Sequence, residues 1–164
     1  MNLQPLFETQ AKLDKRIVEK KGLQGQDLLD KKILSLQVEL GELANELPEV
    51  FKFWSNKKNN YKKALEEYCD CLHFILSIGL EHNFDEEYPL LLIEGLEMPS
   101  ITEQFTMLMR TDWDIYEEGC GGYYHEGLEL FLKLGEMLGF TWEQIEESYF
   151  AKNKINHERQ ANGY

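Results

Sequence analysis

Residues 33–47 read ILSLQVELGELANEL, and this stretch decides the fold. Its large apolar residues recur every three or four positions and so share one stripe of an α-helix: Ile33, Leu36, Leu40, Leu43 and Leu47. The stretch therefore predicts an amphipathic helix, which we expect to begin near Asp27 and to end before Pro48.

Two pairs of acidic residues lie at the edges of apolar helical stripes. The first is Glu39-Leu-Gly-Glu42, in the helix just described. The second is Glu67-Tyr-Cys-Asp70, in a helix expected from about Tyr61 to His82. Residues three apart on a helix lie close together, so each pair aims two carboxylates at one spot. If the two helices pack antiparallel, all four carboxylates converge.

Such carboxylates have two interpretations. The simpler one is a solvated face of acidic helices, because charged residues are commonest on protein surfaces. A carboxylate drawn toward an apolar interior, however, is costly unless it is paired or binds a metal. No Lys or Arg stands three or four positions from Glu39 or Glu42 to pair with it. We therefore expect a metal site, and oxygen-only ligands favour Mg²⁺.

Length and composition exclude several classes of protein. The 164 residues fit one domain, 1–164, with 43% hydrophobic residues to build a core. A net charge of −13 argues against binding to a nucleic-acid backbone. The cysteines Cys69, Cys71 and Cys120 form no CxxC pair, so we expect neither a zinc site nor disulfides. We therefore expect a cytoplasmic location. No apolar run reaches the roughly 18 residues of a membrane span.

The rest of the chain also has helical rather than strand periodicity, so the expected fold class is all-α, a helical bundle with antiparallel central helices. In the first helix we expect Phe7, Leu13 and Ile17 to be buried. Thr141 and Gln144 have the spacing of a capping box that opens the last long helix. The other expected helices are Leu6–Lys20, Leu90–Leu96, Glu103–Met109 and Leu128–Leu138.

One face of the last helix changes from apolar to basic. Ile145 and Tyr149 share this face with the possible phosphate ligands Lys152, Asn156 and Arg159. Lys and Arg are the usual partners of phosphate groups. The alternative is a frayed, solvated C-terminal helix.

These motifs resemble the all-α dimeric dUTPases, within the MazG-like all-α NTP pyrophosphatase superfamily. The resemblance rests on the two acidic pairs and on a tail with the pattern K-N-x-x-N-x-x-R-Q, from Lys152 to Gln160. It also includes Gln10-x-x-Leu13-Asp14-x-x-Ile17 and the segment 51–54, Phe-Lys-Phe-Trp. Residues 83–140 contribute nothing to it.

The resemblance implies Mg²⁺-dependent hydrolysis of dUTP, and of dUDP, to dUMP by direct attack of water. It implies that Glu39, Glu42, Glu67 and Asp70 are the metal ligands, with Glu39 or Glu42 as the general base. By the same resemblance Lys152, Asn156 and Arg159 would bind the phosphates. Gln10 and Trp54 would form part of the base pocket, and Asn153 would lie near the phosphates or the sugar. A homodimer is implied, with nucleotide sites completed across the interface.

Two other functions remain open from the sequence. One is a pyrophosphatase of dCTP or of another nucleoside triphosphate, with the same metal site and a different base pocket. The other is a non-catalytic helical protein whose apolar faces mediate dimerisation. His73, one turn after Asp70, has either a supporting role at the metal site or a structural one.

Overall fold

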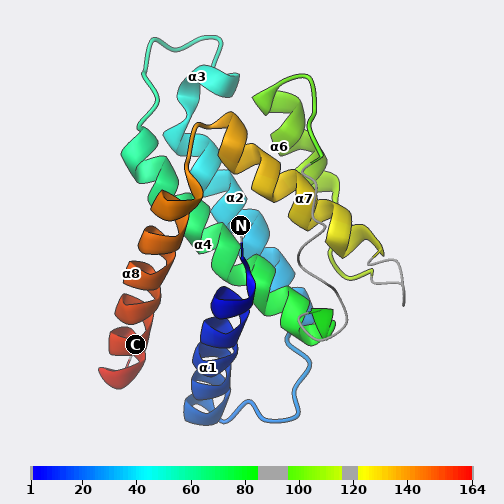
Figure 1. The fold of residues 1–164 in the computed structure, drawn as a ribbon, viewed down its shortest axis with the longest axis vertical. Coiled ribbons are helices and arrows are strands. Elements are labelled where there is room, and N and C mark those ends of the chain that lie inside the picture. The colour runs from blue at the N-terminus through cyan, green and yellow to red at the C-terminus, as the bar shows by residue number, and fades with distance from the viewer. Residues whose placement is uncertain (1, 85–95, 116–121, 164) are drawn as a thin grey trace.

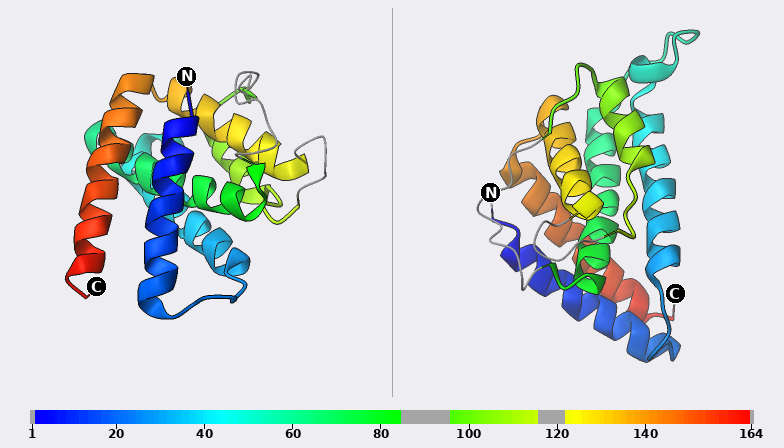
Figure 2. Two further views of the ribbon diagram at one scale, coloured as in Figure 1. Left: turned by 60° about the horizontal axis from the view of Figure 1, so that its bottom comes forward. Right: turned by 90° about the vertical axis from the view of Figure 1, so that its right-hand side faces the viewer.

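A computed structural model describes residues 2–84, 96–115 and 122–163 (Figures 1 and 2). All regular elements in these ranges are helices, which confirms the predicted all-α class. They are α1 (Gln4–Lys21), α2 (Leu29–Glu46), α3 (Pro48–Phe51), α4 (Tyr61–Glu81), α6 (Ile101–Arg110), α7 (Gly122–Met137) and α8 (Trp142–Ala161). None of these helices is long and apolar enough to cross a membrane.

The two helices that carry the acidic pairs form the centre of the fold. α2 and α4 run antiparallel and make the most extensive contact in the molecule (Figure 1). The predicted stripe of α2 is buried at Leu36, Leu40, Leu43 and Leu47, whereas Ile33 is only partly buried at the edge of the core. One apolar face of α4 is buried, at Ala64, Tyr68, Cys71, Ile75 and Ile78.

The outer helices cover this pair from two sides. α1 and α8 pack on α4 and on each other, and α6 and α7 form a second layer (Figure 2). The predicted capping box opens α8: the Thr141 hydroxyl accepts a hydrogen bond from the Gln144 N–H, and the Gln144 side chain accepts one from the Thr141 N–H. The cap sets where α8 begins and therefore the register of its basic face.

Three sequence-based expectations need correction. Ile17 is half-buried rather than buried, because the core opens there into a cleft. The helix expected at 128–138 begins six residues earlier, at Gly122. Leu96 is not helical, and the rest of the helix expected at 90–96 lies outside the described residues, as does Cys120.

Candidate active site

Three of the four predicted carboxylates meet where α2 faces α4. Glu39 of α2 and Glu67 and Asp70 of α4 each place a carboxylate oxygen within 4.8 Å of the other two. Glu67 is buried and Asp70 is largely so, with 15% of its side chain exposed. The spacing of three residues on α4 brings its two carboxylates to one side, and the antiparallel partner helix supplies the third.

Glu42, the fourth predicted ligand, lies outside this group and is exposed. Two residues three apart on a helix differ by about 60° around its axis, so Glu39 faces α4 while Glu42 turns toward solvent. The charge of Glu42 still acts on its neighbour. Burial, followed by the negative charges of Asp70, Glu42 and Glu67, raises the pKa of Glu39 to about 7, against the opposing effect of Lys152.

Two lysines compensate part of this negative charge. The Lys152 ammonium of α8 donates to Asp70 with Nζ 2.5 Å from Oδ2, and the Lys63 Nζ lies 3.0 Å from Glu67 Oε1. The salt bridge with Glu67 raises the pKa of Lys63. Each lysine therefore offsets the charge of one carboxylate of the cluster. This donor set of carboxylate oxygens fits a hard divalent cation such as Mg²⁺.

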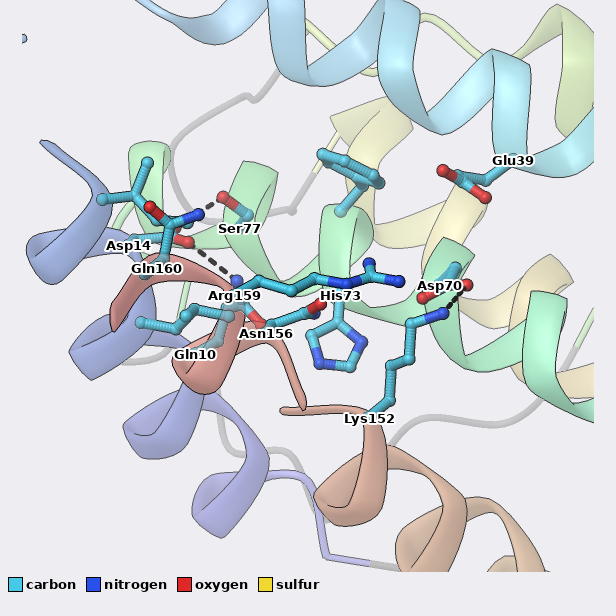
Figure 3. Close-up of a pocket in the computed structure, with 13 residues that line it drawn as sticks. Gln10, Asp14, Glu39, Asp70, His73, Ser77, Lys152, Asn156, Arg159 and Gln160 are labelled. Carbon is cyan, nitrogen blue, oxygen red and sulfur yellow. Dashed lines mark hydrogen bonds and ion pairs between the residues drawn. The ribbon is translucent and has the colours of Figure 1, made fainter. Parts of the chain in front are cut away.

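A cleft of about 240 Å³ extends from the acidic cluster between α1, α4 and α8 (Figure 3). Lys152 and Arg159 extend from α8 into it. The predicted phosphate ligands thus share one cleft with Glu39 and Asp70. Its full lining is Gln10, Leu13, Asp14, Ile17, Glu39, Asp70, His73, Phe74, Ser77, Lys152, Asn156, Arg159 and Gln160.

Comparison with known proteins agrees with this geometry. A family model described as dUTPase matches residues 2–164. The chain belongs to the dUTPase family. It is a dUTPase of the all-α type, and its activity is that of a dUTP diphosphatase. No curated protein matches the chain.

The dUTPase cleft contains one of the three residues expected to contact the base or sugar. Gln10 lines it and is 4% exposed. Asn153 is buried in α8 outside the lining, and its side-chain nitrogen has no hydrogen-bond partner in the described part of the chain. Trp54 is 66% exposed in the segment after α3, where its ring contacts Phe51 and Phe53 edge-on. The structure therefore does not bring Trp54 to the cleft of its own chain.

His73 has a structural position at the back of the dUTPase cleft. Its Nδ1 lies 2.7 Å from the carbonyl oxygen of Cys69, which can only accept, so Nδ1 carries the proton. The ring stacks on Tyr149 at 4.2 Å between centroids. Burial lowers the pKa of His73 to about 4, and the imidazole is neutral at physiological pH.

Two residues at the floor of the cleft were given no role in the site from the sequence. Asp14 of α1 and Ser77 of α4 line it together, and the Ser77 hydroxyl donates to Asp14 over 2.5 Å. Asp14 belongs to the motif shared with the family, and it stands four residues after Gln10 on the same helix face. That spacing was a signal for Asp14, whereas nothing in the sequence pointed to Ser77.

Proposed function

We propose that this dUTPase hydrolyses dUTP, and also dUDP, to dUMP in a Mg²⁺-dependent reaction, with residues 1–164 acting as one domain in the cytoplasm. The observation that carries the proposal is that acidic and basic side chains line the same cleft. Glu39 and Asp70 line one part of it, and Lys152 and Arg159 reach into it from α8. To bind a complex of a divalent cation and a phosphate group, a site needs acidic side chains for the cation and basic side chains for the phosphate.

The ligands proposed for Mg²⁺ are Glu39, Glu67 and Asp70, with Glu42 completing the set. Support comes from the mutual distances of the first three and from the influence of Glu42 on Glu39. A bound divalent cation would supply Lewis acidity and lower the pKa of a coordinated water.

Side chains of the protein bind the phosphates and accept the proton of the attacking water. Lys152, Asn156 and Arg159 bind and orient the phosphates, and the guanidinium can contact two phosphate oxygens at once. Glu39 or Glu42 accepts the proton of the attacking water at its carboxylate, because both lie beside the acidic cluster.

The base binds at the Gln10 end of the cleft, and the protein acts as a homodimer. Leu34 and Val38 support a dimer, because these apolar side chains of α2 are 62% and 51% exposed on one helix face. In such a dimer the exposed Trp54 extends toward the nucleotide of the partner subunit. Asn153 supports the sugar or the phosphates from behind the cleft wall.

Product analysis tests this function. Purified protein is incubated with dUTP, dUDP, dCTP or dTTP, with Mg²⁺ or with EDTA. We expect dUMP and pyrophosphate from dUTP, and dUMP and phosphate from dUDP, only with Mg²⁺. Turnover in EDTA would contradict the metal dependence. Preferred turnover of dCTP would contradict the assignment of the base pocket.

A further inference from the structure

Asp14 lies at the centre of a hydrogen-bond network that joins three helices. Its Oδ1 accepts from Gln10 Nε2 at 2.7 Å. Its Oδ2 accepts from the Ser77 hydroxyl at 2.5 Å and from Lys32 Nζ at 3.4 Å. The side chains of Asp14 and Lys32 are only 19% and 15% exposed. Both carboxylate oxygens are thus held in place by donors from α1, α2 and α4.

Lys32 anchors this network from α2. Its ammonium also donates to Glu81 Oε1 at 2.5 Å and to the backbone carbonyl oxygen of Ser77 at 3.3 Å. It therefore balances the charge of Asp14 and ties the end of α4 to α2. The carboxylate has little freedom to rotate, because its partners are themselves fixed in helices.

The network determines which way the Gln10 amide points. A carboxylate only accepts hydrogen bonds, so the amide nitrogen of Gln10 must face Asp14. The amide oxygen then faces Tyr149, whose hydroxyl donates to it at 2.9 Å. Tyr149 alone would not fix this orientation, since a hydroxyl can donate or accept. Asp14 is the member of the network that excludes the flipped amide.

The orientation matters because a side-chain amide can form hydrogen bonds with either uracil or cytosine, depending on which way it faces. Uracil presents an N3–H donor between two carbonyl acceptors, whereas cytosine presents an N3 acceptor beside an amino donor. A freely rotating Gln amide can match either base by turning through 180°. One fixed orientation matches one of them and leaves unpaired buried polar groups with the other, which is costly.

We propose that Asp14 is a positioning residue that sets the preference for uracil over cytosine by fixing the orientation of the Gln10 amide. This rests on the proposed function, in which Gln10 contacts the base. Thymine has the same hydrogen-bonding edge as uracil. The network therefore discriminates against cytosine and is indifferent to the thymine methyl group.

Asp14→Asn tests the proposal, because an Asn amide offers both a donor and an acceptor and so permits both orientations of Gln10. The measurement is kcat/KM for dUTP, dCTP and dTTP. We expect the dUTP/dCTP ratio to fall by about tenfold or more, while the dUTP/dTTP ratio stays within about twofold of wild type. The loss of one negative charge affects all three nucleotides alike and therefore does not change either ratio.

Three further variants complete the test. Glu8→Gln makes the same charge change at an exposed position of α1, and both ratios should stay at the wild-type value. Tyr149→Phe removes a hydrogen bond from Gln10 but keeps the acceptor-only partner, so it should also preserve both ratios. Asp14→Ser offers a hydroxyl that can donate or accept, so it should lower the dUTP/dCTP ratio as Asp14→Asn does. This variant replaces Asp14→Asn in the test if circular dichroism shows that Asp14→Asn is unfolded.

The outcomes separate this inference from the proposed function. A wild-type protein that hydrolyses no nucleotide overturns the proposed function itself. A wild-type preference for dUTP that persists unchanged in folded Asp14→Asn, or in Asp14→Ser if Asp14→Asn is unfolded, overturns the role of Asp14 alone. An equal fall in both ratios overturns it too, because that result indicates a loosened pocket rather than a freed amide.

Discussion

Lys152 of α8 is ion-paired with Asp70 of α4, with Nζ 2.5 Å from Oδ2, across 82 residues of sequence. This ion pair directly connects the acidic cluster of the cleft with the basic residues of α8. It also means that the chain supplies its own counter-charge to a carboxylate that we assign to the metal site. The contact links the stability of the cation-free protein to the position of α8.

Lys152→Met should therefore lower the free energy of unfolding by about 1–2 kcal/mol in EDTA, because Asp70 keeps a largely buried charge without its partner. The loss should shrink in saturating Mg²⁺, which would neutralise Asp70 instead. Urea unfolding under the two conditions measures the difference. Lys154→Met, at an exposed position of the same helix, is the control. An equal loss with and without Mg²⁺ would count against a shared role of Asp70.

Glu39→Gln should have opposite effects with and without the cation. In EDTA it removes one of several mutually repelling carboxylates, so the melting temperature should rise above that of wild type. Mg²⁺ at 100 times its dissociation constant should stabilise wild type by about 2.7 kcal/mol and the variant far less. Thermal unfolding with increasing Mg²⁺ provides both numbers. A Glu147→Gln control should respond to Mg²⁺ like wild type, and a similar response in Glu39→Gln would exclude that residue as a ligand.

His73 should make the protein sensitive to acid. Its pKa is about 4 in the folded protein and about 6.5 in an unfolded chain. Between these pH values the unfolded chain binds more protons than the folded protein does. The contribution of His73 to the free energy of unfolding is therefore complete above pH 6.5 and is lost as the pH falls toward 4. Between pH 7.5 and 4.5 the loss should be about 2 kcal/mol.

His73→Phe keeps an aromatic ring against Tyr149 and removes the titrating group. The variant will be less stable than wild type at pH 7.5, because it lacks the hydrogen bond to Cys69. Its unfolding free energy should nevertheless fall less steeply with acid. Urea unfolding at several pH values compares the two slopes, and parallel slopes would show that His73 does not titrate as the structure indicates.

The exposed apolar face of α2 predicts the dimer interface. Val38→Lys should convert a homodimer into monomers, because a lysine would be buried without a partner at the interface. Gln37→Lys makes the same charge on the same helix but at a position turned about 100° away, so it should remain dimeric. Light scattering coupled to size exclusion measures the mass. A wild-type monomer, or an unaffected Val38→Lys dimer, would rule out this face.

Much of the fold was predictable because burial and helical periodicity agree in this chain. The stripes of α2 and α4, the capping box of α8 and the basic face of α8 were all present in the spacing of residues. The start of α7 was not, because its first turns contain Gly122 and Gly127, which are poor helix formers. Gly127 lies there because Trp113 leaves no room for a Cβ atom, a tertiary contact that the local sequence does not reveal.

The site was predictable to a similar degree. The spacing of the motif made Glu39 and Glu42 equally good candidates for metal ligands. Only the packing of α2 on α4 shows that Glu39 is the one that lies close to Glu67 and Asp70. The contact between Asp14 and Ser77 joins residues 63 positions apart, so no local pattern could reveal it. The family model supports the dUTPase assignment.

The most direct test of the central claim is the turnover of dUTP by EDTA-treated protein as Mg²⁺ is added back, in wild type and in Asp70→Asn. We predict no turnover before Mg²⁺ is added, full recovery in wild type, and a loss of about 100-fold or more in the variant. Full turnover in EDTA, or an Asp70→Asn protein as active as wild type, would contradict the assignment of the acidic cluster as the metal site of this dUTPase.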